Sequence, residues 1–313
     1  MKHLRLYIYI VTTVLWTATV SAKSYDVSSS APTHWLGVSV MGVEANSLLG
    51  GNTDAFMRPG GGGQFTFFYE VQKKAFFFNV GLGMDYVLTA SALKEHTDAF
   101  TRVDYYDHDV LTYRYIYSHY EEKQTQLRLL VPVQFGYRFG DWFYIGLGAA
   151  FRLSPLLNSF NTTTRMYAEG EYDKHIGPIR DADVYGFWSD AEYKGSGSVR
   201  SAAHEVAVEA EFGARVPLAK KVEMRAGVYL GYDIPLSSYS QRATTPLVDY
   251  SAVDVNPATQ SKANLEANIR FNSMYDTSVL NREVQRIRVG LRLTFLFNVA
   301  QSSKPCMCKD YYR

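Results

Sequence analysis

The stretch that most restricts the fold is Gln124 to Leu153, where apolar residues alternate with polar or small ones on both sides of Gly140. The apolar series is Leu127, Leu129, Val131, Val133, Phe135 and Tyr137 before this glycine and Phe143, Ile145, Leu147, Ala149, Phe151 and Leu153 after it. A period of two makes a strand with one apolar face. Each series extends over 11 positions of the chain, 127–137 and 143–153. This is longer than an ordinary strand of roughly 5 or 6 residues and suits a tilted membrane crossing of about 9 to 11 residues. The stretch therefore predicts a membrane-spanning β-hairpin.

The turn of this hairpin follows from the faces of its strands. Gly140-Asp141 is typical of a two-residue loop, but that register places Phe135 opposite Gly146 and mixes the two faces. A loop with an odd residue count, such as Phe139 to Asp141, matches the faces. It pairs Tyr137 with Phe143, Phe135 with Ile145, Val133 with Leu147 and Leu129 with Phe151. Because a one-residue slip moves every side chain to the other face, we expect the odd loop with a bulge.

The first residues have the pattern of a secretory signal peptide. Lys2 and Arg5 precede the apolar run Leu6 to Val20, and Val20-Ser21-Ala22 resembles a cleavage site. We expect residues 1–22 to be removed; an uncleaved anchor is the alternative. Removal leaves 30 of the 32 basic residues against 31 acidic ones, a net charge of −1 without histidine. This balance predicts no nucleic-acid partner.

Cysteine content and hydropathy narrow the class further. The two cysteines, Cys306 and Cys308, lie at the end of the chain and cannot form its main scaffold. Two ligands are too few for a metal, so we expect oxidised or partner-linked cysteines in a periplasmic tail. After the signal no run of about 20 apolar residues occurs. A mean hydropathy of −0.17 still allows a membrane β-barrel, which distributes its apolar residues over alternate positions.

The same period of two recurs along the chain. Besides the two strands of the hairpin we expect strands over His34–Val43, Gln64–Val71, Phe76–Leu88, His204–Val216, Val222–Ile234 and Val284–Phe297. Short connections at Lys73-Lys74 and Pro217–Lys221 alternate with long ones at Ala45–Gly63, Thr89–Lys123, Ser154–Ser201 and Pro235–Glu283. The Lys73-Lys74 turn would pair Tyr69 with Phe78, and the Thr89–Lys123 excursion is expected to be a hairpin turning near Asp107 to Asp109.

This alternation of short and long connections predicts the architecture. Outer-membrane barrels have short periplasmic turns, long outer loops and an even number of strands. A soluble lipocalin-like barrel would instead have apolar residues inside. We therefore expect an all-β fold, an eight-stranded antiparallel up-and-down transmembrane β-barrel over 34–297. A periplasmic segment, 23–33, would precede it and a periplasmic tail, 298–313, would follow it.

The core of the hairpin, Leu129 to Leu153, resembles the PorT-like outer-membrane β-barrel family of Gram-negative bacteria, in which a proline-bearing strand, a tight turn and an aromatic-glycine strand recur. The layout is also similar to small barrels of the OmpA and OmpX type. The resemblance implies an integral outer-membrane protein and an accessory role in protein secretion. The chain departs from the usual barrel end, because 16 residues (313 minus 297) follow the last aromatic, Phe297.

The inward faces carry many charges. These are Glu70, Asp85, Glu205, Glu209, Glu211, Glu223 and Asp233 together with Arg128, Arg138, Arg152, Arg215, Arg225, Arg286, Arg288 and Arg292. An eight-stranded barrel has room for its side chains and little else. We therefore expect a charge-compensated plug, in which an odd connection centred on Ala219 sets Arg215 directly across from Glu223. A narrow outer-membrane channel is the alternative.

No catalytic constellation emerges from the sequence. His108 lies between two aspartates and His204 precedes a glutamate, but neither has the spacing of a zinc helix or of a triad. We expect no enzymatic activity, no cofactor and no bound metal. A hydrolase built from loop residues is a further alternative.

Aromatic residues cluster in the outer excursions. Tyr105, Tyr106, Tyr113, Tyr115, Tyr117 and Trp188 are candidate contacts for a ligand or partner. Packing of protruding hairpins and of the upper membrane girdle explains them equally well. The expected partners are outer-membrane lipid, the barrel-assembly machinery and an envelope protein bound through the loops or the tail.

Overall fold

The structure is a computed structural model of the chain. It describes residues 32–49, 55–103, 108–153, 155–174, 177–179, 188–199, 204–236, 245–249, 269–277, 279 and 285–299. The expected signal peptide, Tyr105, Tyr106 and both cysteines lie outside these residues.

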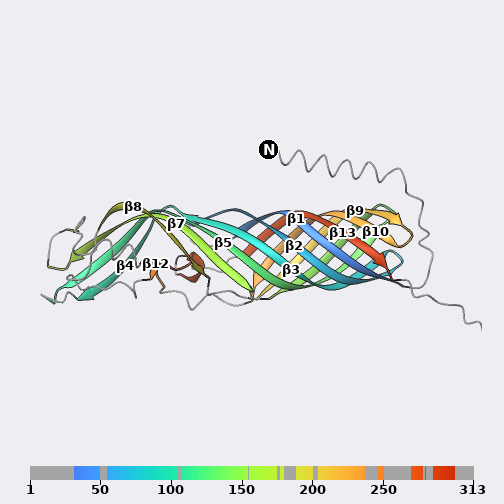
Figure 1. Ribbon diagram of the computed structural model, residues 1–313, viewed down its shortest axis with the longest axis horizontal. Coiled ribbons are helices and arrows are strands. Elements are labelled where there is room, and N and C mark those ends of the chain that lie inside the picture. Colours follow the sequence, from blue (N-terminus) through green and yellow to red (C-terminus); the bar gives the residue numbers. More distant parts are fainter. Residues whose placement is uncertain are drawn as a thin grey trace, which may run out of the picture.

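The main body is a closed antiparallel ring of strands (Figure 1). Its members are β1 (Thr33–Leu49), β2 (Ala55–Lys73), β3 (Phe76–Leu93), β5 (Val110–Phe139), β6 (Phe143–Arg152), β9 (Glu205–Ala219), β10 (Val222–Pro235) and β13 (Gln285–Asn298). Each pairs with the next, β3 pairs with β5, and β13 pairs with β1. The predicted all-β, antiparallel up-and-down barrel is therefore confirmed. No helix in the described part of the chain is long and apolar enough to cross a membrane.

The outer face of the barrel is apolar. On β3 the outward residues from Phe76 to Leu88 are exposed, with Leu82 at 68%, whereas the inward Asp85 is 0% exposed. This series covers about 40 Å of strand at about 3.3 Å per residue, or about 28 Å of height at a tilt of about 45°. Such a band matches the hydrocarbon layer that a transmembrane barrel crosses.

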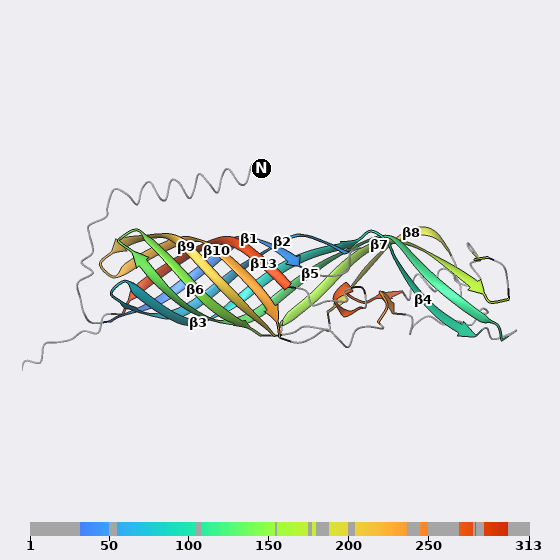
Figure 2. The ribbon, with the colours of Figure 1, turned by 180° about the vertical axis from the view of Figure 1, so that it is seen from behind.

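Beyond the barrel the same sheet continues the wall, so the molecule is elongated (Figure 2). The strands β4 (His96–Val103), β7 (Leu157–Tyr172) and β8 (Trp188–Ser198) join the first half of β5, in the order β4–β5–β7–β8. The short strands β11 (Val248–Asp249) and β12 (Arg270–Phe271) and the 3-10 helix η4 (Met274–Asp276) contribute buried side chains to its core. We call this part the extension.

Two of the expected long connections contain strands of this sheet. Ala45–Gly63 is mostly strand, because β1 runs to Leu49 and β2 starts at Ala55, with a bulge between Arg58 and Gly61. The glycine run stays extended because β2 pairs on both sides. Ser154–Ser201, expected as a long connection with no strand named in it, contains β7 and β8. The expected hairpin within Thr89–Lys123 is present, since Val103 pairs with Val110.

The turns keep the predicted faces, although the exact pairs differ. Phe139 pairs with Phe143, so the loop is odd, with Gly140 at φ 59°, but Tyr137 lies opposite Ile145 instead of Phe143. Lys73 pairs with Phe76, and Tyr69 therefore with Val80 instead of Phe78. Each pairing is offset by two residues, which leaves every side chain on its own face. Alternation fixes that face and not the offset.

Candidate functional site

The charged residues predicted to face inward lie inside the barrel. Fourteen of them are buried, and Arg138 is half-buried beside the short turns. They form three successive layers of ion pairs along the barrel axis. Each layer joins strands that are distant in the sequence.

The layer on the side of the extension has two parts, and the part closer to the middle of the barrel is a closed arrangement of two aspartates and two arginines. Arg152 donates to Asp233 at 2.6 Å and to Asp85 at 3.2 Å. Arg288 donates to the same two carboxylates, at 2.8 Å to Asp233 and 3.1 Å to Asp85. All four side chains are at most 2% exposed. Each charge therefore has at least two opposite charges in contact, which offsets the cost of burying it.

Above this arrangement Glu205 lies between two further arginines. Its carboxylate contacts Arg128, and Arg286 lies 3.7 Å away. Arg286 also lies 3.5 Å from Asp233, so it links this group to the closed arrangement below. The three side chains close the interior at the end that faces the extension.

The middle layer combines carboxylates with tyrosines. Arg292 donates to Glu211 at 2.9 Å, and Tyr229 donates to Glu209 at 2.9 Å. The Tyr144 hydroxyl donates to Glu211, and its ring lies on the inward face of β6. Large side chains therefore occupy the centre of the lumen.

The layer at the short turns is built around one arginine. Arg225 makes two hydrogen bonds to Glu70, at 2.6 and 2.9 Å, and one to Glu223 at 2.8 Å. Arg215 donates to Glu223 at 2.6 Å, although the strand register places Arg225, and not Glu223, directly across from it. The expected ion pair is thus present as a diagonal pair. The expected direct register is wrong because the β9–β10 ladder is shifted by a bulge at Val222.

The space left between these layers is small. A cavity in the middle layer, lined by residues such as Gln134, Glu211 and Arg292, measures about 20 Å³. One water needs about 10 to 15 Å³ when volume is measured in this way. This cavity therefore has room for about one water at this level.

A polar ladder leads from these layers into the extension along the inward face of β5. Tyr120 donates to Glu122 at 2.9 Å, Gln124 donates to Glu122 at 2.9 Å, and Gln126 donates to Gln124 at 3.5 Å. Arg128 then donates to Gln126. Each residue bonds the one two positions away, because alternate side chains of a strand share a face. The ladder connects the core of the extension with the arginines of the barrel.

Glu122 of the ladder also bonds a segment that is distant in sequence, at Ser273 and Met274. Besides Tyr120 and Gln124, its carboxylate accepts hydrogen bonds from the Ser273 hydroxyl and, at 2.6 Å, from the Met274 backbone N–H. Its side chain is buried and lies beyond the apolar band. Burial raises the pKa of Glu122 above its usual 4.5, and the hydrogen bonds oppose that rise only in part.

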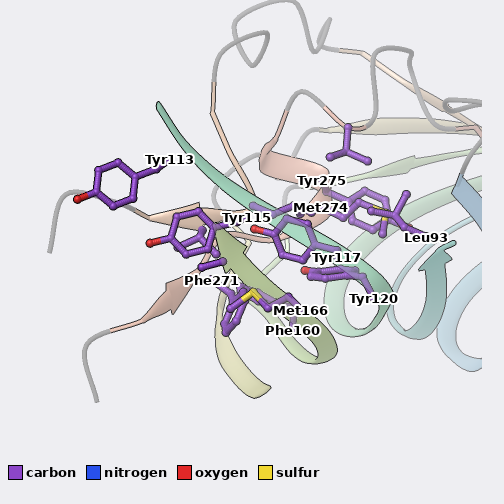
Figure 3. Close-up of a cluster of buried hydrophobic side chains, with 14 of the residues drawn as sticks. Leu93, Tyr113, Tyr115, Tyr117, Tyr120, Phe160, Met166, Phe271, Met274 and Tyr275 are labelled. Atoms are coloured by element: carbon purple, nitrogen blue, oxygen red, sulfur yellow. The ribbon is translucent and has the colours of Figure 1, made fainter. Parts of the chain in front are cut away.

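The extension has a hydrophobic core of its own (Figure 3). Tyr113, Tyr115 and Tyr117 are 3%, 1% and 0% exposed within it and pack with Met274 and other residues of the distant segment. Of the two alternatives for these three tyrosines, the structure therefore shows packing within the extension. Alternation placed them on one face, but only the covering segment decides that this face is buried. The side chain of Trp188 lies outside the described residues.

The described ranges contain no candidate metal site. Clusters of three or more histidine, cysteine or carboxylate side chains suited to a metal are absent from them. His108 sits in a turn with φ 55°, and the ring of His204 stacks on Phe151 at 5.7 Å. Both positions are those of turn and rim residues.

Several residues of the site were not predicted from the sequence. Tyr144 and Tyr229 donate to the interior carboxylates, and Glu122 holds the extension. All three share the inward parity of the predicted charges, which was the signal that could have identified them. An aromatic residue among apolar neighbours does not by itself indicate the polar face.

Comparisons with known proteins add little to this description. The sequence matches no protein-family model and no curated protein. Among solved structures it is similar to Ail, the attachment invasion locus protein of Yersinia pestis, solved in complex with the heparin analogue sucrose octasulfate. The two chains share 7% identity with a TM-score of 0.27, and the alignment covers 85% of this chain and 99% of Ail. The barrel assignment rests on the strand pairings of this chain.

Proposed function

We propose that the chain is an integral outer-membrane protein, without enzymatic activity, whose plugged barrel anchors a rigid extension that binds a partner outside the membrane. One observation carries this proposal. The strand β5, 30 residues from Val110 to Phe139, runs unbroken from the extension into the barrel. It pairs with β4 and β7 in one half and with β3 and β6 in the other.

The rigidity of the extension supports a binding role. Its sheet is continuous with the barrel wall and has its own core, so it holds its outer face in a fixed orientation relative to the membrane. A preorganised surface loses less entropy on binding than a mobile loop does. The partner would be an envelope protein or a molecule outside the cell.

The resemblance of Leu129 to Leu153 to PorT-like barrels supports one form of this role, an accessory function in protein secretion. In that form the partner is a component of the secretion apparatus. Deleting the gene should then lower the amount of secreted protein, while an inserted barrel alone, without the extension, should not restore it.

Photo-crosslinking tests the proposal directly. A photoreactive amino acid at Val103 or Arg165, which are 64% and 62% exposed on the extension, should give protein adducts in intact cells. The same group at Leu82, 68% exposed on the apolar band, is the control and should react with lipid. Protein adducts from none of the extension positions would contradict the binding role.

Insertion and conduction are tested separately. The purified chain should migrate differently in boiled and unboiled detergent samples and should fractionate with outer membranes. In planar bilayers the inserted protein should show no steady conductance, because the charge layers fill the lumen. A stable single-channel current would support the channel alternative instead.

A further inference from the structure

The rim of the barrel carries two cations on adjoining strands. The register places Arg58 of β2 and Lys123 of β5 directly opposite Ala90 of β3, one on each side. Both cationic side chains are exposed, Arg58 at 51%. Ala90 between them is too short to fill the gap. The three residues therefore form a shallow saddle with a positive group on either side.

The height of this saddle is that of a lipid headgroup. Leu88, 40% exposed, ends the outward apolar series of β3, and Ala90 follows two residues later. Two residues advance a strand by about 7 Å, and a tilt of about 45° reduces the rise to about 5 Å. The two cations thus lie immediately above the hydrocarbon band, on the side of the extension.

The spacing suits one phosphate. Two strand spacings separate the backbones of Arg58 and Lys123 by about 10 Å. A guanidinium and an ammonium on long side chains can both reach an anion held over Ala90. Arginine and lysine are the side chains that bind phosphate most readily, through charge-assisted hydrogen bonds.

Glu121 and His119 are further titratable groups on this face. Glu121 lies 2.5 Å from Arg58 and 3.4 Å from His119, and it is 27% exposed. An exposed pair of this kind contributes little stability, so a phosphate can displace Glu121 from Arg58. Lys123 has no ion-pair partner among the described residues. Lys123 is therefore a cation that can bind a ligand.

We propose that Arg58 and Lys123 bind the phosphate of a lipid headgroup in the leaflet that faces the extension. The inference rests on the proposed membrane insertion, because only an inserted barrel holds the saddle at this height. The lipid would be a phosphorylated glycolipid with its acyl chains along the apolar face of β3. The site fixes lipid at one side of the barrel, beneath the extension.

The test compares lipid binding by the full-length protein and its variants in detergent. The probes are diphosphoryl lipid A, the same lipid without its phosphates, and inorganic phosphate. The double variant Arg58→Gln with Lys123→Gln should lose about tenfold or more of the lipid A affinity, since two charge-assisted contacts disappear. Glu121→Gln should raise that affinity, because it removes a competing anion. Lys220→Gln with Lys221→Gln, at the short turns, is the matched control and should bind as the natural protein does.

Insertion of each variant is checked in the same preparation by the mobility of unboiled samples. If the natural protein inserts but binds both lipids equally, or if the double variant binds lipid A unchanged, the phosphate site is wrong and the proposed function stands. If no variant inserts and the natural protein also fails to insert, the proposed function itself is wrong. Equal affinity for inorganic phosphate and lipid A would assign the saddle to a free anion and overturn the lipid proposal.

Discussion

The backbone N–H of Met274 donates a 2.6 Å hydrogen bond to the Glu122 carboxylate across 152 residues of sequence. This bond connects the long segment between β10 and β13 to the middle of β5. The same carboxylate accepts from Ser273, Gln124 and Tyr120. Because four donors bond this buried carboxylate, Glu122 links the core of the extension to the polar ladder that leads to the barrel.

Replacing Glu122 should destabilise the extension and leave the stability of the barrel unchanged. In Glu122→Ala four donors lose their acceptor, and each buried unpaired donor costs about 1 to 3 kcal/mol. We expect faster hydrogen exchange at the Met274 and Tyr275 amides. The amides of Leu291 and Leu293 on β13 are the control and should exchange unchanged, because Glu122 makes no contact with the lipid-spanning part of the ring. An equal acceleration of exchange at the β13 amides would show that the extension and the barrel do not unfold separately.

The same carboxylate should make the extension sensitive to pH. Burial raises the pKa of Glu122 in the folded state above the 4.5 of the unfolded chain. The folded state therefore binds the proton more tightly, and this contribution to stability is fully present below pH 4.5. It should be lost as the pH rises from 4.5 through the raised pKa. Hydrogen exchange at Met274 measured across this range should accelerate with pH beyond the intrinsic rate, and Glu122→Gln should abolish the excess.

Breaking the closed arrangement of charges should destabilise the barrel itself. Asp85→Asn leaves Arg152 and Arg288 each without one of their carboxylate partners in a fully buried site. Removing one partner of a buried pair typically costs about 3 to 5 kcal/mol. Asp190→Asn, which breaks the exposed pair with Arg165, is the control and should cost at most about 1 kcal/mol. Urea unfolding followed by unboiled gel mobility measures both; equal losses would mean that burial does not strengthen the pair.

The barrel can be predicted from the sequence because the lipid bilayer restricts which structures can cross it. Every strand of the ring must show apolar residues at alternate positions over its whole crossing, and a closed ring is the sheet form without free edges. The segment from Phe76 to Leu88 shows this directly, since its outward residues are exposed and apolar. The same alternation assigned Arg152 and Arg288 to the interior, where the structure places them.

The extension could not be predicted in the same way. There the outer face of the sheet is in water and the inner face is covered by a segment distant in sequence, so burial depends on a contact such as that of Tyr117 with the region of Met274. The strand β7 has many threonines and no long apolar series, and its sequence is also compatible with a loop. The sequence pattern also does not distinguish registers that differ by two residues, because such an offset keeps every side chain on its face.

The glycines on the inner face should be required where a plug residue leaves no room. A Cβ on Gly227 would lie 2.6 Å from the Tyr144 hydroxyl and 3.1 Å from the Phe212 carbonyl oxygen. Gly227→Ala should therefore destabilise the barrel by about 1 to 3 kcal/mol, since overpacking forces neighbours to move. Gly42→Ala, whose Cβ meets nothing within 4 Å, is the matched control. Adding Tyr144→Phe should recover part of the loss, because it removes the atom in closest contact. A double-mutant cycle from urea unfolding would show this as a coupling between the two sites, and strict additivity would mean that Tyr144 does not set the space at Gly227.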